Sequence, residues 1–160
     1  MGNVADRGGP ERLTADVVLF TQQGGVWSVL TVERAKEPFL AALALPGGFV
    51  EPGERVPEAA VRELAEETGI VVPTRRLRRL GLYRKRGRDP RGPVATVAFH
   101  SYSPGAPEAT GGSDARAAGW IPVTDLLSEA MRVAFDHRDI VRDAVIRRFG
   151  RVPQPVGAVL

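Results

Sequence analysis

Short hydrophobic runs bounded by glycine- and proline-containing turns recur along the chain and predict β-strands. Residues 15–20 and 26–32 are rich in β-branched and aromatic side chains, and the segment between them contains Gly24 and Gly25, which favour a hairpin turn. The same kind of pattern predicts strands over 43–50, interrupted by a tight turn, and over 77–83, 94–102 and 119–122. The Gly-, Pro- and Ala-rich stretch from 104 to 118 is predicted to be a loop.

Helical patterns lie between these strands and after them. Residues 57–68 carry an apolar helix face made by Ala60, Val61, Leu64 and Ala65. Pro57 suits the first turn of this helix and Gly69 suits its C-terminal cap. Further helices are predicted near 124–130 and over 136–149. Strands and helices in this mixed order predict an α/β (α+β) sandwich.

The chain length and composition predict one globular domain. A chain of 160 residues with 43% hydrophobic content is long enough for one ordinary core. We therefore expect a single domain over 1–160, with flexible termini at about 1–13 and 150–160. No apolar stretch approaches the length of a membrane span, and the N-terminus does not resemble a secretion signal. The chain has no cysteine, which excludes disulfides and thiolate metal sites and is consistent with a cytoplasmic location.

An acidic cluster occupies the other face of the predicted helix 57–68. Glu63, Glu66 and Glu67 stand at i, i+3 and i+4, so that their carboxylates lie together. Each like-charge pair at this spacing destabilises a helix by roughly 0.2–0.5 kcal/mol. A divalent cation, which prefers oxygen ligands, would remove this repulsion. With the glycines and the arginine nearby, the cluster indicates a magnesium-phosphate site.

The stretch from Gly48 to Ile70 resembles a complete Nudix box, the signature of hydrolases that cleave a nucleoside diphosphate linked to another group. The resemblance implies an α/β/α sandwich with a mixed central sheet and a Mg²⁺ cofactor, for which Mn²⁺ could substitute. It also implies individual roles: Glu66 and Glu67 as principal metal ligands, Glu63 as a ligand or as the base that orients water, Arg62 as the holder of a neighbouring carboxylate, and Glu54 as a support from the preceding loop. The alternative is an amphipathic surface helix with a solvated acidic face.

Two glycines before the helix have a separate use. Without side chains, Gly47 and Gly48 allow the backbone to approach a metal ion or a phosphate closely. By the family resemblance, the Gly47 carbonyl is a main-chain metal ligand and Gly48 contacts substrate. An ordinary turn after Pro46 is the structural alternative.

Three segments outside the box resemble the ADP-ribose pyrophosphatase branch of the Nudix hydrolases. They are Arg34 to Phe39, Arg88-Asp89-Pro90-Arg91-Gly92 and Phe135-Asp136-His137. The resemblance implies that ADP-ribose is cut to AMP and ribose 5-phosphate, with Arg34, Arg88 and Arg91 as substrate-binding residues. Arginine can grip phosphate or ribose oxygens with two parallel hydrogen bonds. A charged turn stiffened by Pro90 is the alternative.

Two further positions carry predictions about the site. The loop acid that completes such a site is predicted to be Asp114, with Glu108 as the second candidate, and either could instead be a solvated loop carboxylate. His137 is predicted to be a structural residue near the start of the last helix, because the box already supplies carboxylates.

The net charge of +3 hides an uneven distribution, because nine Arg or Lys residues fall between Arg75 and Arg91. Such a patch could bind nucleic acid, but few aromatic residues are interleaved to stack bases, so we expect solvated strand surface and no nucleic-acid partner. The expected partner is a nucleotide-sugar substrate, with no membrane and with a homodimer hinted at by the resemblance. A nucleoside triphosphate house-cleaning pyrophosphatase and a non-catalytic Nudix-like ligand sensor remain alternatives.

Overall fold

The computed structural model describes residues 9–112 and 114–152. Its strands are β1 (Arg12–Gln23), β2 (Val26–Arg34), β3 (Leu43–Ala44), β4 (Gly47–Phe49), β5 (Arg78–Tyr83), β6 (Val94–Tyr102) and β7 (Ala115–Pro122). Its helices are α1 (Val56–Thr68), the short 3₁₀ helix η1 (Thr74–Arg76), α2 (Val123–Leu126) and α3 (His137–Phe149).

The strands form one mixed sheet with β1 at its centre. The main strand order is β3-β2-β1-β6-β5, with β4 paired to β1 and β7 paired to β2. The pair β1–β6 is parallel and the other pairs are antiparallel. The predicted hairpin between β1 and β2 is confirmed: Gln23 lies opposite Val26, and Gly24 and Gly25 turn the chain with φ angles of 54° and 78°, which glycine adopts without a steric penalty.

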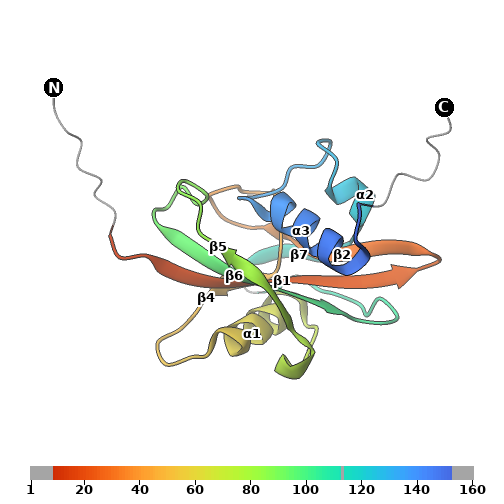
Figure 1. Cartoon of the computed structure of the whole chain (residues 1–160), viewed down its shortest axis with the longest axis horizontal. Coiled ribbons are helices and arrows are strands. Elements are labelled where there is room, and N and C mark those ends of the chain that lie inside the picture. Colours follow the sequence, from red (N-terminus) through yellow and green to blue (C-terminus); the bar gives the residue numbers. More distant parts are fainter. Residues whose placement is uncertain (1–8, 113, 153–160) are drawn as a thin grey trace.

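Helices cover both faces of the sheet, as the predicted sandwich requires. In Figure 1, α1 lies on one side of the sheet and α2 and α3 lie on the other. Side chains of β1 alternate between two buried clusters, Ala15, Val17 and Leu19 with α1, and Val18 and Phe20 with α3. Because both faces are covered, the strand reads as an almost continuous hydrophobic run.

Helix α1 carries the acidic cluster and is anchored by its apolar face. It begins at Val56 with Pro57 in its first turn, and it ends where Gly69, at φ 75°, donates its N–H to the Ala65 carbonyl. The buried residues are Ala59, Ala60, Leu64 and Thr68. The predicted apolar face is therefore rotated slightly, since Val61 and Ala65 are only half-buried.

Several elements are longer or shorter than predicted. β1 begins at Arg12, within the segment predicted to be flexible, because residues 12–20 pair with the whole of β6. β7 begins at Ala115, inside the predicted loop, because Ala115 pairs with Arg34 of β2. α2 is a single turn of four residues. Residues 1–8, 113 and 153–160, including most of the predicted flexible ends, lie outside the described residues.

A change of partner along one edge of β1 opens space for a site. β2 pairs with β1 only at Phe20–Gln23, whereas β4 takes the same edge at Thr14–Asp16. Pro46 lies between the two pairings, just before β4, and its carbonyl accepts the Val17 N–H at 3.0 Å. β2 and β4 therefore diverge, and α1 packs against β4 beside this opening. Within the described residues, no helix is long and apolar enough to cross a membrane.

Candidate active site

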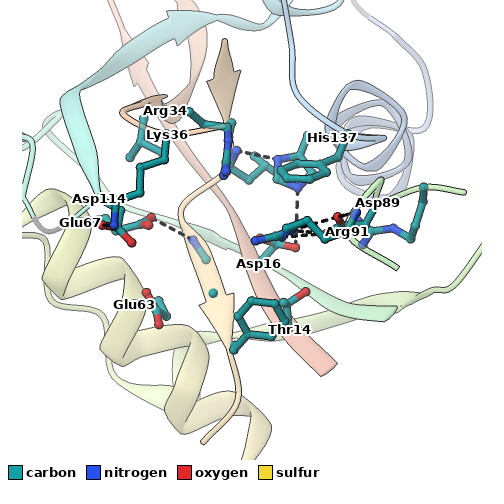
Figure 2. Close-up of a pocket in the computed structure, with 18 of the residues that line it drawn as sticks. Thr14, Asp16, Arg34, Lys36, Glu63, Glu67, Asp89, Arg91, Asp114 and His137 are labelled. Atoms are coloured by element: carbon teal, nitrogen blue, oxygen red, sulfur yellow. Dashed lines mark hydrogen bonds and ion pairs between the residues drawn. The ribbon is translucent and has the colours of Figure 1, made fainter. Parts of the chain in front are cut away.

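A pocket of about 330 Å³ lies at the divergence of β2 and β4 and is lined mainly by charged side chains (Figure 2). The strands, α1, the loop before β6 and the segment before α3 all contribute to it. Of the predicted site residues, Glu54, Arg62 and Glu66 do not line the pocket, whereas those that do are Arg34, Gly47, Gly48, Glu63, Glu67, Arg88, Arg91 and Asp114. The structure thus brings together segments that are far apart in the sequence.

Arg62 organises the acidic side of the site. Its guanidinium binds both oxygens of Glu54 at 2.7 and 2.9 Å, Glu63 at 2.8 Å and Glu66 at 3.3 Å. It also donates to the Phe49 carbonyl at 3.1 Å. Hydrogen bonds from Arg62, and then from the Glu51 N–H, lower the pKa of Glu54 to about 2. Arg62 thus contacts three carboxylates at once, and the roles of Arg62 and Glu54 in the site stay predictions.

Glu67 is the most deeply placed acid of α1. Burial raises its pKa to about 8, and the charges of Glu63 and Asp16 act in the same direction. The Gly47 N–H donates to Glu67 Oε2 at 3.1 Å and favours the ionised form, but not enough to offset burial. Burial also raises the pKa of Glu63. Two carboxylates that are destabilised as anions are thus held beside the same backbone segment.

The glycines of β4 are required by close contacts. A Cβ atom on Gly47 would lie 2.1 Å from Asp16 Oδ1 and 2.4 Å from the Ala15 carbonyl oxygen. A Cβ atom on Gly48 would lie 2.5 Å from the Glu63 carboxyl group. Any side chain at either position would displace an acid of the pocket, and the approach of this backbone to a metal ion or a phosphate stays a prediction.

The donor set fits a hard divalent cation. Carboxylate oxygens of Glu63 and Glu67 and a backbone segment of glycines supply the oxygen chemistry that Mg²⁺ and Mn²⁺ prefer, and a cation would offset the burial of both anions. Across residues 9–112 and 114–152, no group of three or more His, Cys, Asp or Glu side chains is already gathered to hold a metal. The reason is visible in the contacts, because Arg62 holds Glu63 and Glu66 while the Gly47 N–H holds Glu67.

Asp114 lies at the rim of the pocket. It forms an ion pair of 2.6 Å with Lys36, and its backbone carbonyl accepts the Ala35 N–H. Figure 2 shows Lys36 and Asp114 beside Glu67. Glu108, the second candidate for the loop acid, is not among the residues that line this pocket. The placement favours Asp114 and adds Lys36, a residue that the sequence analysis did not single out.

Arg88 lines the pocket and is held by contacts within the protein. Its guanidinium binds Asp136 through two hydrogen bonds of 2.9 and 2.6 Å and donates to the Val94 carbonyl at 3.3 Å. The side chain is only 4% exposed. Its donors are therefore committed to holding the loop before β6 against the start of α3. Asp136, the residue before α3, makes no side-chain cap for that helix and binds Arg88.

Arg91 remains accessible at the pocket wall. Asp89, itself buried, binds the guanidinium at 2.7 Å and orients it. The guanidinium carbon lies 5.2 Å from the ring centre of Phe49 and 5.5 Å from that of Phe135. Arg34 lies 4.9 Å from the Phe135 ring and donates to the Pro38 carbonyl at 2.7 Å. Two arginines and two aromatic rings thus face the pocket.

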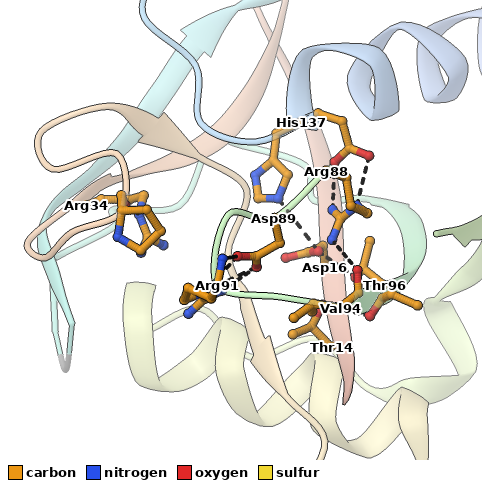
Figure 3. Close-up of polar contacts among 12 residues, drawn as sticks. Thr14, Asp16, Arg34, Arg88, Asp89, Arg91, Val94, Thr96 and His137 are labelled. Atoms are coloured by element: carbon orange, nitrogen blue, oxygen red, sulfur yellow. Dashed lines mark hydrogen bonds and ion pairs between the residues drawn. The ribbon is translucent and has the colours of Figure 1, made fainter. Parts of the chain in front are cut away.

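A buried polar group on β1 forms the base of the pocket and was missed in the sequence (Figure 3). Asp16 is 5% exposed, accepts a hydrogen bond of 2.5 Å from Thr96 and lies 3.7 Å from His137 Nε2. The Leu45 N–H donates to His137 Nδ1 at 2.9 Å, so in the neutral ring the proton is on Nε2, facing Asp16. His137 also lines the pocket, and its structural role stays a prediction. A lone acid in the run Ala15 to Phe20 was the signal for Asp16, because buried carboxylates need partners.

Comparison with known proteins identifies the family. The model of the NUDIX domain matches residues 10–144, and the chain therefore belongs to this family and has its fold. An ADP-ribose pyrophosphatase of Methanocaldococcus jannaschii is 42% identical over 115 residues, which cover 72% of this chain and 64% of that protein. The ADPR responsive transcriptional repressor NtrR of Acinetobacter baylyi is 29% identical over 84% of this chain and 53% of its own length. The chain thus spans less than two thirds of both relatives.

Solved structures show the same fold with related ligands. The NUDIX domain of Shewanella oneidensis NrtR, complexed with ADP ribose, is 31% identical with a TM-score of 0.80, covering 88% of this chain and 90% of that one. A bifunctional NMN adenylyltransferase/ADP ribose pyrophosphatase of Francisella tularensis, complexed with AMP and a Mn ion, is 25% identical with a TM-score of 0.74. The match covers 87% of this chain and 42% of that one.

Proposed function

We propose that this NUDIX protein is a magnesium-dependent pyrophosphohydrolase that converts ADP-ribose and water to AMP and ribose 5-phosphate. The observation that carries the proposal is the position of Glu67, a buried carboxylate beside the Gly47 backbone in a pocket that also holds Arg34 and Arg91. Carboxylates that could bind a metal ion and guanidinium groups that could bind phosphate therefore line the same pocket. An amphipathic surface helix with a solvated acidic face would not bury Glu67 in this way.

The residues of the Nudix box have different proposed roles in hydrolysis. Bound Mg²⁺, or Mn²⁺ in its place, would neutralise phosphate oxygens and favour the ionisation of water. Glu66, Glu67 and the Gly47 carbonyl are the proposed ligands, and Glu63 is either a ligand or the base that accepts a proton from the attacking water. Arg62 fixes the Glu63 carboxylate at 2.8 Å. Asp114 is proposed as the loop acid at the rim of the pocket.

The substrate assignment rests on the other half of the pocket. Arg34 and Arg91 stand beside Phe135, and cations with exposed N–H groups suit the second phosphate or the distal ribose. The relatives named for ADP-ribose pyrophosphatase and for binding ADP ribose support the same class of ligand. The similarity to the NrtR domain supports one alternative, a sensor that binds ADP-ribose without turnover. Cytoplasmic location and a homodimer stay predictions.

A substrate panel tests the proposed function. The protein is incubated with Mg²⁺ or Mn²⁺ and with ADP-ribose, other ADP-sugars, nucleoside triphosphates and oxidised nucleotides, and products are separated by chromatography. We expect AMP and ribose 5-phosphate from ADP-ribose, with turnover abolished by EDTA. Faster release of pyrophosphate from triphosphates would assign the house-cleaning activity. Tight binding of ADP-ribose without product would assign the sensor.

Arg91→Ala is expected to affect hydrolysis of ADP-ribose more than hydrolysis of a nucleoside triphosphate. If Arg91 binds the distal ribose phosphate or its hydroxyls, kcat/KM for ADP-ribose falls. The fall corresponds to a loss of about 1.5–3 kcal/mol of transition-state stabilisation, the range for charge-assisted hydrogen bonds. Hydrolysis of a small triphosphate is preserved. Steady-state kinetics on both substrates measures the difference. An equal loss on both would place Arg91 on a phosphate that they share, and no loss on either would make it part of a rigid surface turn.

A further inference from the structure

We propose that the protein has a second anion site, remote from the pocket, that binds a compact oligophosphate by its phosphate groups alone. The site is a hollow of about 250 Å³ where η1, β5, β6 and the last turn of α3 meet. We call it the arginine hollow; it is lined by Arg75, Arg76, Arg78, His100, Ser101, Tyr102 and Arg148. None of these residues lines the candidate active site.

Two guanidinium groups of the arginine hollow are held in place before any ligand binds. Arg148 lies 5.3 Å from the ring centre of Tyr102, 5.6 Å from that of Phe20 and 5.7 Å from that of Trp27. Arg78 donates from Nη1 to the Arg75 carbonyl at 3.0 Å and to the Leu77 carbonyl at 3.3 Å. Donors that are already fixed lose less side-chain entropy when they bind a phosphate.

The positive charge of the arginine hollow is not balanced by carboxylates. Elsewhere in the basic stretch, Arg84 pairs with Glu11, Arg88 with Asp136 and Arg91 with Asp89. In contrast, within the described part of the chain, none of the four arginines of the hollow forms an ion pair. Repulsion among these cations is relieved when an anion binds between them.

His100 is a titratable residue in the wall of the arginine hollow. It stands opposite Arg78 on the neighbouring strand, and its Nδ1 atom is buried without a hydrogen-bond partner. Buried polar atoms without partners are rare in folded proteins. Burial, followed by the charges of Arg148, Arg147 and Arg78, lowers the pKa of His100. An anion in the arginine hollow would reduce the repulsion and give the ring a polar neighbour.

The shape of the arginine hollow favours phosphate groups over nucleotide bases. Binding of single-stranded nucleic acid combines a cationic groove with free aromatic faces for the bases. Here Arg148 lies over Tyr102 and Trp27 and occupies the faces that a base would use. The volume of about 250 Å³ suits a few linked phosphates. Tripolyphosphate is therefore the appropriate probe.

Isothermal titration of the full chain with tripolyphosphate tests this proposal. EDTA is present, so that no metal recruits the anion to the active site. We expect saturable binding, and we expect Arg78→Gln and Arg75→Gln each to weaken it about tenfold or more, the effect of one charge-assisted hydrogen bond. The matched control is Arg116→Gln, which removes the same charge from an exposed position on β7 and should change the affinity less than about twofold.

Trp27 gives a local readout because Arg148 lies against its ring. In a Trp120→Phe background Trp27 is the remaining tryptophan, and its emission should change on titration with tripolyphosphate but not in Arg78→Gln. Absence of binding, or equal weakening by Arg116→Gln, would overturn the site. Loss of binding in Arg91→Gln but not in Arg78→Gln would place the anion in the active site. Tighter binding of a short single-stranded RNA than of tripolyphosphate would replace the proposal with a nucleic-acid surface.

Discussion

Glu67→Gln is expected to lower kcat/KM for ADP-ribose by at least about a hundredfold, because it removes an anionic metal ligand. The same substitution is expected to stabilise the metal-free protein. Burial raises the pKa of Glu67 to about 8, so the ionised side chain is unfavourable in the fold at neutral to alkaline pH. A neutral amide avoids that cost, and its oxygen can still accept the Gly47 N–H.

The pH dependence of this stabilisation has a defined sign. The folded-state pKa of about 8 lies above the ordinary value of 4.5, so the contribution of Glu67 to stability is fully present below pH 4.5 and is lost as the pH rises through 8. Each pKa unit corresponds to about 1.4 kcal/mol. We therefore expect Glu67→Gln to be more stable than wild type by on the order of 4 kcal/mol near pH 8, and by little near pH 4.5.

Thermal denaturation across this pH range, with EDTA and then with Mg²⁺, measures both effects. A difference of about 4 kcal/mol corresponds to a melting temperature higher by roughly 8–16 °C. Mg²⁺ should raise the melting temperature of wild type by mass action and should have less effect on Glu67→Gln. Glu58→Gln, on the exposed first turn of the same helix, is the control and should match wild type. Turnover within tenfold of wild type under saturating Mg²⁺ would exclude Glu67 as an essential ligand.

The box region was predictable from sequence because its constraints are local. The spacing of Glu63, Glu66 and Glu67 is set by helix geometry, and Gly69 ends the helix for reasons that any helix shares. The contacts of Arg62 with Glu54 and Glu63 follow the same short-range logic. These features need no knowledge of the rest of the fold.

Contacts across the fold were less predictable. Asp16 could have been noticed as a lone acid in a hydrophobic strand, but its partners Thr96 and His137 are 80 and 121 positions away in the chain. The early start of β7 depends on the pairing of Ala115 with Arg34, which no local pattern contains. Arg88 was predicted to bind the substrate. Its contact with Asp136 joins two segments that are far apart in the sequence, so no local pattern contains it.

Arg88→Gln is expected to destabilise the fold by about 3–5 kcal/mol, the cost of breaking a buried ion pair by removing one partner. The Arg88 side chain is 4% exposed and that of Asp136 is 18% exposed, so water only partly replaces the lost hydrogen bonds. The Val94 carbonyl also loses a donor. Because the loop that carries Asp89 and Arg91 is attached through Arg88, the KM for ADP-ribose should rise as well, through the position of that loop.

A double-mutant cycle with Asp136→Asn distinguishes an anchor from a substrate ligand. If Arg88 acts through Asp136, each single substitution lowers the melting temperature by roughly 10 °C, and the double mutant is far less destabilised than the sum, with a coupling energy of about 2–3 kcal/mol. Arg84→Gln with Glu11→Gln gives the matched cycle for an exposed pair, where coupling should stay below about 1 kcal/mol. Two results would instead indicate that Arg88 binds the substrate. One is additive losses in stability, and the other is a large fall in kcat/KM for Arg88→Gln with an unchanged melting temperature. The pocket would then need a conformation in which Asp136 releases the guanidinium.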